Sequence, residues 1–407
     1  MPSLRRTFRA HGLPPRRARP RPARAVAVGQ GLPNREPTAS AKTRVLVLSA
    51  SLGAGHDGAA RELVRRLEAR GHQAVISDVL SAAPFRIGSM IERNYQRQLR
   101  WAPWTYEVSY RTWHRFPSLC RPLEVFLSLL TKRRVMRWIR SEQPDVVVGA
   151  HPISAQVLGR LRERGVLALP VVTLVTDFAV HPVWVHRSVD LHLCVHPDAA
   201  AMAATRSGRP ARAPGPLVAA AFRSDLPTRE HARQLLSLPR ECRAVLVVAG
   251  SWGVGNIEET FDALVADGRY TPIVVCGTND RLRRQLAGKG HGRVLGWTND
   301  MPILMAAAEA LVENAGGLTC MEAFAVGLPV ISFLPIAGHG RENAAAMESS
   351  GVVTYCRSAG DLIPTLDRVT GTAGNATVIA AKAMFGGDAA SEVAALAGQT
   401  RARPNSW

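Results

Sequence analysis

Residues 313–333 read ENAGGLTCMEAFAVGLPVISF, and this stretch decides how the chain is interpreted. Glycines such as Gly316 and Gly317 let a backbone come close to a ligand, and the free N–H groups of a following helix favour phosphate oxygens. Glu322 lies one helical turn beyond Thr319, so it faces the same side. The stretch therefore predicts a phosphate-binding turn followed by a carboxylate that accepts the hydroxyl protons of a ribose.

The end of the same stretch predicts how the helix stops. Gly327 is typical of a helix C-terminus, and Pro329 cannot continue the helix. The apolar residues 329–334 then have the composition of a buried parallel strand. Similar runs alternate with helical segments along the chain, which predicts an α/β fold with doubly wound sheets. The predicted strands are 44–50, 74–79, 145–150, 170–176, 190–195, 243–250, 272–276, 292–296, 309–313, 329–334 and 352–355.

The length of the chain predicts two domains, since 407 residues are too many for one ordinary core. A passage rich in Pro, Gly and Arg near 208–228 separates the two alternations, as a linker or a last short strand does. We expect Rossmann-like domains over 44–225 and 226–370, and a partly helical tail over 371–407. Residues 1–43 are rich in Arg and Pro and are expected to be disordered.

Composition limits the partners and the compartment. The formal net charge is +19, and much of it lies in residues 1–43, which either contact anionic lipid or nucleic acid or form a solvated extension. The six cysteines include no C-x-x-C pair, which disfavours zinc ribbons and disulfide scaffolds and favours a reducing, cytoplasmic compartment. No apolar run is long enough to span a bilayer.

Residues 94–116 interrupt the regular alternation. They hold three Trp, three Tyr and one Phe interleaved with arginines. Such a mixture suits a membrane interface, because aromatic rings anchor there and arginines meet phosphates. It also suits stacking of nucleic-acid bases, and it equally fits a helical insertion that packs its aromatic side chains on its own domain.

Two further glycine-rich turns follow predicted strands. Residues 51–56 (SLGAGH) match neither a Walker A sequence nor a complete dinucleotide fingerprint. Gly55 allows close approach of a ligand there, and His56, at the predicted start of a helix, is either a general base or a helix cap. In the second turn, Gly250, Ser251 and Gly253 offer backbone N–H groups and a hydroxyl to phosphate oxygens.

Polar residues at two other strand ends point to the opposite side of a cleft. Asp177 follows the strand 170–176 and is placed to orient an acceptor hydroxyl or a histidine base, with His181 nearby. His151 and Gln156 follow the strand 145–150 and are expected to line the cleft. The spacing of the histidines at 181, 186, 192 and 196 is no known ligand signature, so we expect no metal site.

The order of these motifs resembles the monogalactosyldiacylglycerol synthase family. The resemblance rests on Gly-x-Gly-His, His-Pro-x-x-x-x-Gln, Val-Thr-Asp, the glycine-rich turn, Gly-Gly-Leu-Thr-x-x-Glu-Ala and Gly-Leu-Pro, and covers roughly residues 44–355. The chain is more distantly similar to the N-acetylglucosaminyltransferase that makes peptidoglycan lipid II. The resemblance implies an inverting glycosyltransferase of the GT-B type, with two Rossmann-like domains facing across a cleft.

The resemblance also implies roles for single residues. Gly55 and His56 match the acceptor-side motif, and Asp177 matches a position near the acceptor. The positions that match the donor side are Gly316, Gly317 and Thr319 at the diphosphate, Glu322 at the ribose, and Asn343 after the donor-sugar loop. The loop itself departs from the family: residues 337–343 read AGHGREN where Pro-Gly-Gln-Glu is usual, and Asn314 stands where Lys is common. The identity of the sugar therefore stays open.

We expect a hexosyltransferase that moves a sugar from a UDP-sugar to the hydroxyl of a lipid such as diacylglycerol. The N-terminal domain would bind the acceptor and the C-terminal domain the UDP-sugar. Neither a metal, another cofactor nor nucleic acid is expected to take part, and the protein is expected to be cytoplasmic and attached peripherally to an anionic membrane. A soluble acceptor, a non-hydrolysing nucleotide-sugar epimerase and a non-catalytic nucleotide-sugar or lipid sensor remain alternatives.

Overall fold

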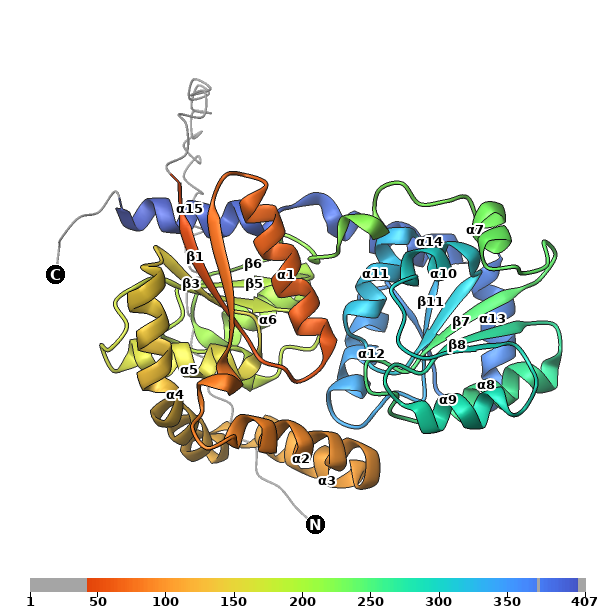
Figure 1. The fold of residues 1–407 in the computed structure, drawn as a ribbon, viewed down its shortest axis with the longest axis horizontal. Helices are drawn as coiled ribbons and strands as arrows, with labels where there is room; N and C mark the ends of the chain where they lie inside the picture. The colour runs from red at the N-terminus through yellow and green to blue at the C-terminus, as the bar shows by residue number, and fades with distance from the viewer. Residues whose placement is uncertain (1–41, 372–373, 402–407) are drawn as a thin grey trace, which may run out of the picture. The chain divides into compact units, whose positions relative to one another are not determined.

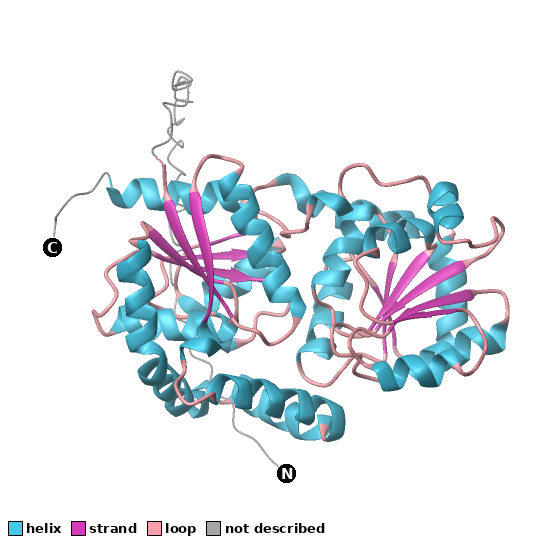
Figure 2. Ribbon diagram, in the orientation of Figure 1, coloured by secondary structure: helices cyan, strands magenta, loops and turns pink. Residues whose placement is uncertain are grey.

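Two parallel sheets carry the fold in the computed structural model, which describes residues 42–371 and 374–401 (Figure 1). The predicted disordered tail over 1–43 lies, up to residue 41, outside the described residues. Helices cover both faces of each sheet (Figure 2). We call the part with the first sheet the N-terminal half and the part with the second sheet the C-terminal half.

The sheet of the N-terminal half has the strand order β2-β1-β3-β4-β5-β6, and its pairings are parallel. Its strands are β1 (Arg44–Ser49), β2 (Gln73–Asp78), β3 (Val146–Gly149), β4 (Val171–Val175), β5 (Leu191–Cys194) and β6 (Ala211–Arg212). Its helices are α1 (Ala54–Glu68), α2 (Ile87–Trp101), α3 (Pro103–Arg115), α4 (Arg121–Glu142), α5 (Pro152–Glu163) and α6 (Pro197–Ser207).

The sheet of the C-terminal half has the order β12-β11-β10-β7-β8-β9 and is also parallel. Its strands are β7 (Ala244–Val248), β8 (Thr271–Val275), β9 (Arg293–Leu295), β10 (Ala310–Glu313), β11 (Val330–Phe333) and β12 (Thr354–Cys356). The helices that follow in the chain are α7 (Arg229–Leu235), α8 (Ile257–Asp267), α9 (Asp280–Ala287), α10 (Met301–Ala307), α11 (Leu318–Val326), α12 (His339–Ser349), α13 (Leu362–Thr370), α14 (Gly374–Ala383) and α15 (Ala389–Arg401). Short 3-10 helices are η1 (Val79–Ala82), η2 (Pro117–Cys120), η3 (Pro182–Trp184), η4 (Ala220–Phe222), η5 (Ala359–Asp361) and η6 (Met384–Gly386).

The central strands form because apolar side chains fill both faces of each sheet. In β1, Val45 and Val47 belong to the core on one face, and Leu46 and Leu48 belong to the core on the other. The strand β7 alternates in the same way between two cores. The predicted α/β fold is thus confirmed, since continuous apolar runs are what strands buried on both sides require.

Each sheet has one point where the strand order reverses, and these points position the site. The reversal lies between β1 and β3 in the first sheet and between β7 and β10 in the second. Loops that leave neighbouring strands in opposite directions open a crevice there, outside the carboxyl ends of the strands. The glycine-rich turns at 51–56, 250–256 and 314–317 follow β1, β7 and β10.

Local details both confirm and correct the sequence predictions. Gly327 follows α11 in the left-handed conformation (φ 84°), as predicted for a helix end. The helix predicted to start at His56 begins two residues earlier, because Gly53 (φ 102°) already turns the chain into α1 at Ala54. The last predicted strand is shifted to β12, so that Cys356 pairs with β11.

The last helix returns to the N-terminal half. In Figure 1 the blue helix α15 lies beside elements of that half, and Ala389, Val393 and Ala397 join the core behind β1 and α1. The chain therefore passes twice between the halves. The first passage lies between Leu217, in the core of one half, and Val218, in the core of the other; the second joins η6 to α15.

Candidate active site

A cavity of about 770 Å³ lies at the carboxyl ends of the two sheets. Its walls come from α2 and from the segments that follow β1, β4, β5 and β6 in the first sheet and β7 to β11 in the second. Ligands bind at this place in open α/β sheets, because the strand reversals leave room there for a group against the loops.

Two helix N-termini meet at this cavity. The first residues of α1 and of α11 both line it. The helices are close because α1 carries Gly58, where a Cβ would lie 2.4 Å from a methyl carbon of Leu318. A helix N-terminus presents unpaired N–H groups and a partial positive charge. The two together make this wall of the cavity suited to an anion.

His56 stands on the third residue of α1 and lines the cavity. Its Nδ1 lies 2.8 Å from Oγ1 of Thr176, at the end of β4. The rings of His151 and Trp184 pack around it, with centroids at 4.7 and 5.5 Å. Burial lowers the pKa of His56, and the Asp177 carboxylate only partly opposes this. At neutral pH the imidazole is therefore uncharged and able to accept a proton.

Asp177 lines the cavity but is held by neighbours on both oxygens. One oxygen accepts a hydrogen bond from Nε1 of Trp184 at 2.8 Å, and the other accepts from Nδ2 of Asn343 at 3.3 Å. Asn343 also accepts from the backbone N–H of Ala179 at 2.9 Å. Asn343 is thus outside the cavity lining and ties the C-terminal half to the loop that carries Asp177.

The three other residues predicted on the acceptor side hold the backbone rather than line the cavity. Nδ1 of His151 accepts from the N–H of Ile153 and caps α5. Gln156 donates to the carbonyl oxygens of residues 183 and 185 at 3.0 and 2.9 Å. His181 accepts from the N–H of Val183, and its Nε2 lies 3.2 Å from the carbonyl oxygen of residue 110. Gln156 and His181 thus fix the loop after β4 that carries Asp177 and Trp184, and the ring of His151 packs against Trp184.

The turn after β7 is shaped by glycines. Gly250 and Gly253 have φ angles of 66° and 59°, and a Cβ on Gly253 would lie 2.4 Å from the carbonyl oxygen of Cys276. Nδ2 of Asn279 donates to the carbonyl oxygen of Gly253 at 2.8 Å. Gly250 and Ser251 line the cavity, whereas Gly253 supports the turn from behind.

Glu313 shapes the turn after β10, a role that the sequence analysis missed. One of its carboxylate oxygens accepts from the N–H groups of Ala315 and Gly316 at 2.7 and 2.5 Å, and the other accepts from the hydroxyl of Ser332. This bends the chain so that Gly317 faces the cavity while Gly316, with φ 67°, packs against the Asn343 side chain. The position of Glu313, three residues before Gly316 and at the end of a predicted strand, was the available signal.

Glu322 and Thr319 line the cavity from α11, one turn apart as predicted. Glu322 is half-buried and has no hydrogen-bond or ion-pair partner among the described residues. Burial raises its pKa to about 8. A desolvated carboxyl without a protein partner is available to a ligand that brings its own hydrogen-bond donors.

The aromatic insertion forms α2 and α3. Some of its aromatic side chains face the cavity, and others are exposed to solvent. Tyr95 lines the cavity and packs edge-on against Trp252, with ring centroids 5.7 Å apart. Trp101 and Trp104 are 69% and 70% exposed. Both interpretations of the insertion therefore hold in part: some of its aromatic side chains pack inside the protein, and others lie exposed on its surface. No helix within 42–371 and 374–401 is both long and apolar enough to cross a bilayer.

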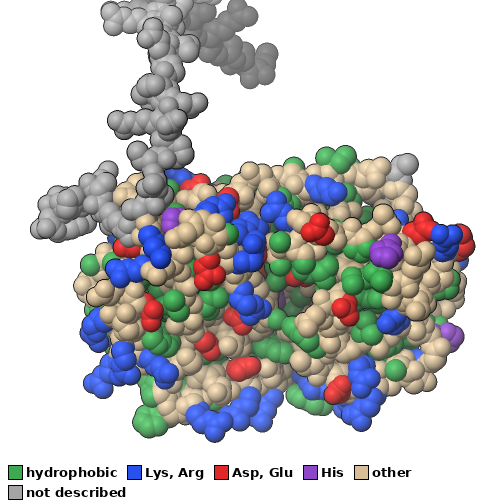
Figure 3. All heavy atoms as spheres, turned by 45° about the horizontal axis from the view of Figure 1, so that its top comes forward, with side chains coloured by type: hydrophobic (Ala, Val, Ile, Leu, Met, Phe, Trp, Pro, Cys, Tyr) green, Lys and Arg blue, Asp and Glu red, His purple; other side chains and the backbone are tan. Residues whose placement is uncertain are grey.

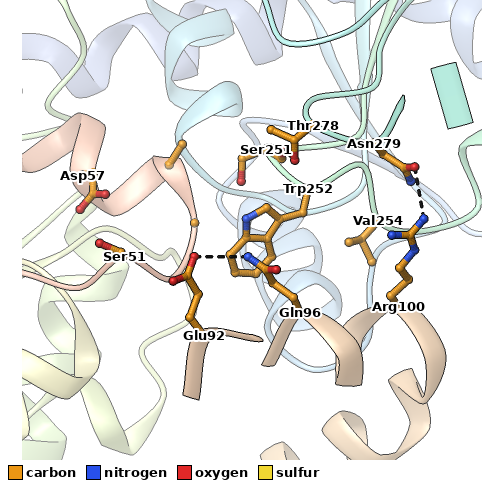
Figure 4. Close-up of a pocket in the computed structure, with 12 residues that line it drawn as sticks. Ser51, Asp57, Glu92, Gln96, Arg100, Ser251, Trp252, Val254, Thr278 and Asn279 are labelled. Carbon is orange, nitrogen blue, oxygen red and sulfur yellow. Dashed lines mark hydrogen bonds between the residues drawn. The ribbon is translucent and has the colours of Figure 1, made fainter. Parts of the chain in front are cut away.

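A side pocket of about 550 Å³, drawn in Figure 4, shares Ser251 and Trp252 with the lining of the cavity. Glu92, Gln96 and Arg100 project into it from successive turns of α2. Across the pocket, Arg100 donates to Oδ1 of Asn279 at 3.4 Å, and the Trp252 indole lies between the two walls. The insertion thus contacts the turns of the C-terminal half directly.

The structure brings eight of the fourteen predicted site residues to the cavity. They are Gly55, His56, Asp177, Gly250, Ser251, Gly317, Thr319 and Glu322. The other six, namely His151, Gln156, His181, Gly253, Gly316 and Asn343, lie behind the lining. The described residues contain no group of three or more His, Cys, Asp or Glu arranged to hold a metal ion.

Known proteins share both halves. The family model for monogalactosyldiacylglycerol (MGDG) synthase matches residues 56–212, and the model for the glycosyltransferase family 28 C-terminal domain matches residues 244–370. A processive diacylglycerol beta-glucosyltransferase of Bacillus cytotoxicus is 26% identical over 334 residues, covering 77% of this chain and 82% of that protein. Its counterpart in Bacillus cereus strain Q1 is 25% identical over 330 residues, with the same coverage.

Solved structures share the fold. MurG of Acinetobacter baumannii aligns with a TM-score of 0.52 and 14% identity, over 88% of this chain and 99% of MurG. TcCGT1 in complex with UDP aligns with a TM-score of 0.56 and 14% identity, over 88% of this chain and 99% of that one. The chain therefore has the GT-B fold. Its N-terminal half matches the MGDG synthase model and its C-terminal half the glycosyltransferase family 28 C-terminal model, which confirms the resemblance seen in the sequence.

Proposed function

We propose that the protein transfers a hexose from a UDP-sugar to a hydroxyl of a lipid acceptor such as diacylglycerol, with inversion at the anomeric carbon. One observation carries the proposal: an uncharged His56 lies on the same cavity as the abutting N-termini of α1 and α11. A base and an anion-binding wall on one cavity are what this transfer needs. The curated relatives named above are diacylglycerol glucosyltransferases, which supports the choice of acceptor.

The donor fits the wall of the C-terminal half. The diphosphate would lie at the turns that carry Gly250 and Gly317, where backbone N–H groups and helix dipoles favour negative charge. Glu322 would accept hydrogen bonds from the two ribose hydroxyl groups, since it is desolvated and lacks a protein partner among the described residues. The structure of the fold neighbour TcCGT1 is a complex with UDP, which supports the choice of donor.

The reaction would proceed in one displacement. The acceptor oxygen forms a bond to the anomeric carbon of the hexose while the bond from that carbon to the β-phosphate oxygen breaks. The electron pair leaves with UDP, and the acceptor proton goes to His56. A two-step route with retention would need a carboxylate free to attack the sugar, but both oxygens of Asp177 are engaged by Trp184 and Asn343. This favours inversion, with Asp177 stabilising the imidazolium that forms.

The acceptor would reach the site from an anionic membrane surface. Residues 85–140 hold twelve Arg or Lys and three Glu, and their exposed apolar side chains include Trp101, Trp104 and Phe116. In Figure 3, basic side chains gather along the lower margin of the molecule with apolar ones between them. Aromatic anchors among arginines suit the headgroup region of a bilayer. We therefore propose peripheral attachment through α2, α3 and α4.

The test is a transfer assay with the purified full chain. Vesicles that contain diacylglycerol and an anionic lipid are incubated with radiolabelled UDP-glucose, UDP-galactose or UDP-N-acetylglucosamine, with and without EDTA, and the lipid is extracted. We expect label in the lipid phase, unaffected by EDTA and lost in His56→Ala. The anomeric configuration of the product, read by NMR, distinguishes inversion from retention.

Other outcomes would replace the proposal. Release of UDP without lipid labelling indicates a soluble acceptor or hydrolysis. Interconversion of the UDP-sugar itself indicates an epimerase. Binding of UDP without turnover of any donor indicates a sensor.

A further inference from the structure

Residues 337–343, which depart from the family pattern, are held by side chains of the inserted helix α3. Oε2 of Glu107 accepts a hydrogen bond from the backbone N–H of Gly338 at 2.5 Å. The hydroxyl of Tyr106 lies 3.0 Å from Nδ1 of His339. One turn further along α3, Tyr110 donates to Oε2 of Glu342 at 3.0 Å. Three side chains of the N-terminal half thus hold the loop before α12 and the first turn of α12 in the C-terminal half.

The contact is close enough to fix the loop. Gly338 has φ +69°, and a Cβ there would lie 2.7 Å from the Tyr106 ring and 3.0 Å from the Tyr110 ring. The tyrosines therefore pack directly on the backbone, where only glycine fits. Burial raises the pKa of Tyr106 well above its usual value, so its hydroxyl keeps its proton and remains a hydrogen-bond partner at neutral pH.

These contacts orient His339 toward the cavity. His339 lines the cavity, and its Nδ1 is engaged by Tyr106. Its other ring nitrogen has no partner among the described residues, so it is available to a ligand. In the proposed reaction the hexose lies between the diphosphate turn at Gly317 and the base His56. His339 borders that space, since it lines the same cavity as Gly317 and His56.

We propose that Tyr106 and Glu107 are positioning residues for the donor sugar. They hold Gly338 and His339 so that the His339 imidazole meets the hexose of the UDP-sugar. The inserted helices of the N-terminal half thereby help to select the sugar in a site that the C-terminal half otherwise builds. The inference rests on the proposed function, because its ligand is a UDP-hexose.

The test compares binding of UDP with binding of UDP-glucose and UDP-galactose to the full chain by calorimetry. Tyr106→Phe removes the hydroxyl that contacts His339. Glu107→Gln keeps the shape of the side chain but removes the charge that strengthens the hydrogen bond from Gly338 and that pairs with Arg111 and Arg341. We expect each to weaken binding of the preferred UDP-hexose by about tenfold, as the loss or weakening of a positioning hydrogen bond does. Binding of UDP should change by less than about twofold, because the loop faces the hexose.

Matched controls lose the same groups elsewhere. Tyr270→Phe removes a hydroxyl that bonds Asp367, and Glu392→Gln removes a carboxylate that pairs with Arg212. Both should bind UDP-hexose as the wild type does. The double variant Tyr106→Phe/His339→Gln should bind no more weakly than His339→Gln alone, because Tyr106 acts through His339.

Three results would overturn the inference, and they differ from one another. Variants that bind UDP-hexose like the wild type show that the contacts of Tyr106 and Glu107 do not affect sugar binding. An equal loss of UDP and UDP-hexose binding shows a general structural role. A wild-type protein that binds UDP but none of the UDP-hexoses contradicts the proposed donor itself.

Discussion

His56 illustrates how a half-buried residue obtains its chemistry from its neighbours. Burial lowers its pKa below 6.5, so the imidazole is uncharged through the neutral range. We expect His56→Ala to reduce kcat by about 10²- to 10⁴-fold, the usual contribution of a general base. Because protonation blocks the base, kcat of the wild type at saturating donor should be level above pH 6.5 and fall only below it.

UDP binding to His56→Ala, measured by calorimetry, serves as the control and should change by less than about twofold, since in the proposed reaction His56 acts on the acceptor. A variant that keeps full transfer activity would assign the base to another group.

Glu322 predicts how donor binding depends on pH. Its pKa is raised to about 8, whereas accepting the ribose hydroxyls requires the ionised carboxylate. The ionised fraction rises about tenfold between pH 7 and pH 9, so we expect the affinity for UDP to rise by about that factor and then level off. Glu322→Gln should bind more weakly and lack this rise when both proteins are titrated by calorimetry.

The raised pKa of Glu322 also makes the stability of the folded protein depend on pH, in the opposite direction to the affinity for UDP. Protonated Glu322 is favourable in the folded state at low pH, and this contribution is lost as pH rises through about 8. If the wild type and Glu322→Gln show parallel pH dependence of UDP affinity, the titrating group is elsewhere.

At this scale the sequence located residues better than it oriented them. His56, Asp177 and Glu322 were placed on the cavity by their positions after strands or on a helix face. His151 and Gln156 also follow a strand end, yet they bond backbone groups of loops. Spacing gives the end of the sheet at which a residue lies, but not the direction in which its side chain finds a partner.

Among the elements, α2 and α3 show why part of the site could not be predicted. Alternating strands and helices are local patterns, and they were read correctly because each apolar run is contiguous. The contact between Tyr106 and His339 joins residues 233 positions apart. Nothing in either segment alone indicates it, although the interleaved aromatic residues marked the insertion as unusual.

The exposed face of this helix pair supports a prediction about membranes. Trp101→Glu and Trp104→Glu replace apolar anchors by charges that anionic lipid repels. We expect binding to anionic vesicles, measured by co-sedimentation, to fall by about tenfold or more for the double variant. UDP binding should be unchanged, because neither side chain lines the cavity.

Leu235→Glu is the matched control, since Leu235 is an exposed apolar residue on α7 in the C-terminal half. Equal loss of vesicle binding in the control, or none in the double variant, would move the membrane contact away from α2 and α3.

For the whole molecule, the return of α15 ties stability of the N-terminal half to the end of the chain. Val393 is fully buried in the core behind β1. We expect Val393→Asp to lower the thermal unfolding midpoint by several degrees, because it buries a charge without a partner. Ala395→Asp, on the exposed face of the same helix, should unfold like the wild type.

Identical midpoints for the two variants would show that α15 contributes little to stability. This return was not predicted, since the Ala-rich helix has only a weak apolar pattern and its packing partner is more than 300 positions earlier in the chain.

The two passages between the halves lie against each other. A Cβ on Gly215 would meet the carbonyl oxygen of Met384 at 2.0 Å, and a Cβ on Gly387 would meet Cα of Pro214 at 2.8 Å. A single connecting segment lets two halves rotate freely relative to each other, whereas two connecting segments in contact must bend together. We therefore expect the two halves to move relative to each other by a hinge rotation about these paired segments. Such a hinge would bring His56 and the turns at Gly250 and Gly317 into the same alignment each time the cavity closes, and the close approach at Gly215 and Gly387 keeps the two segments together.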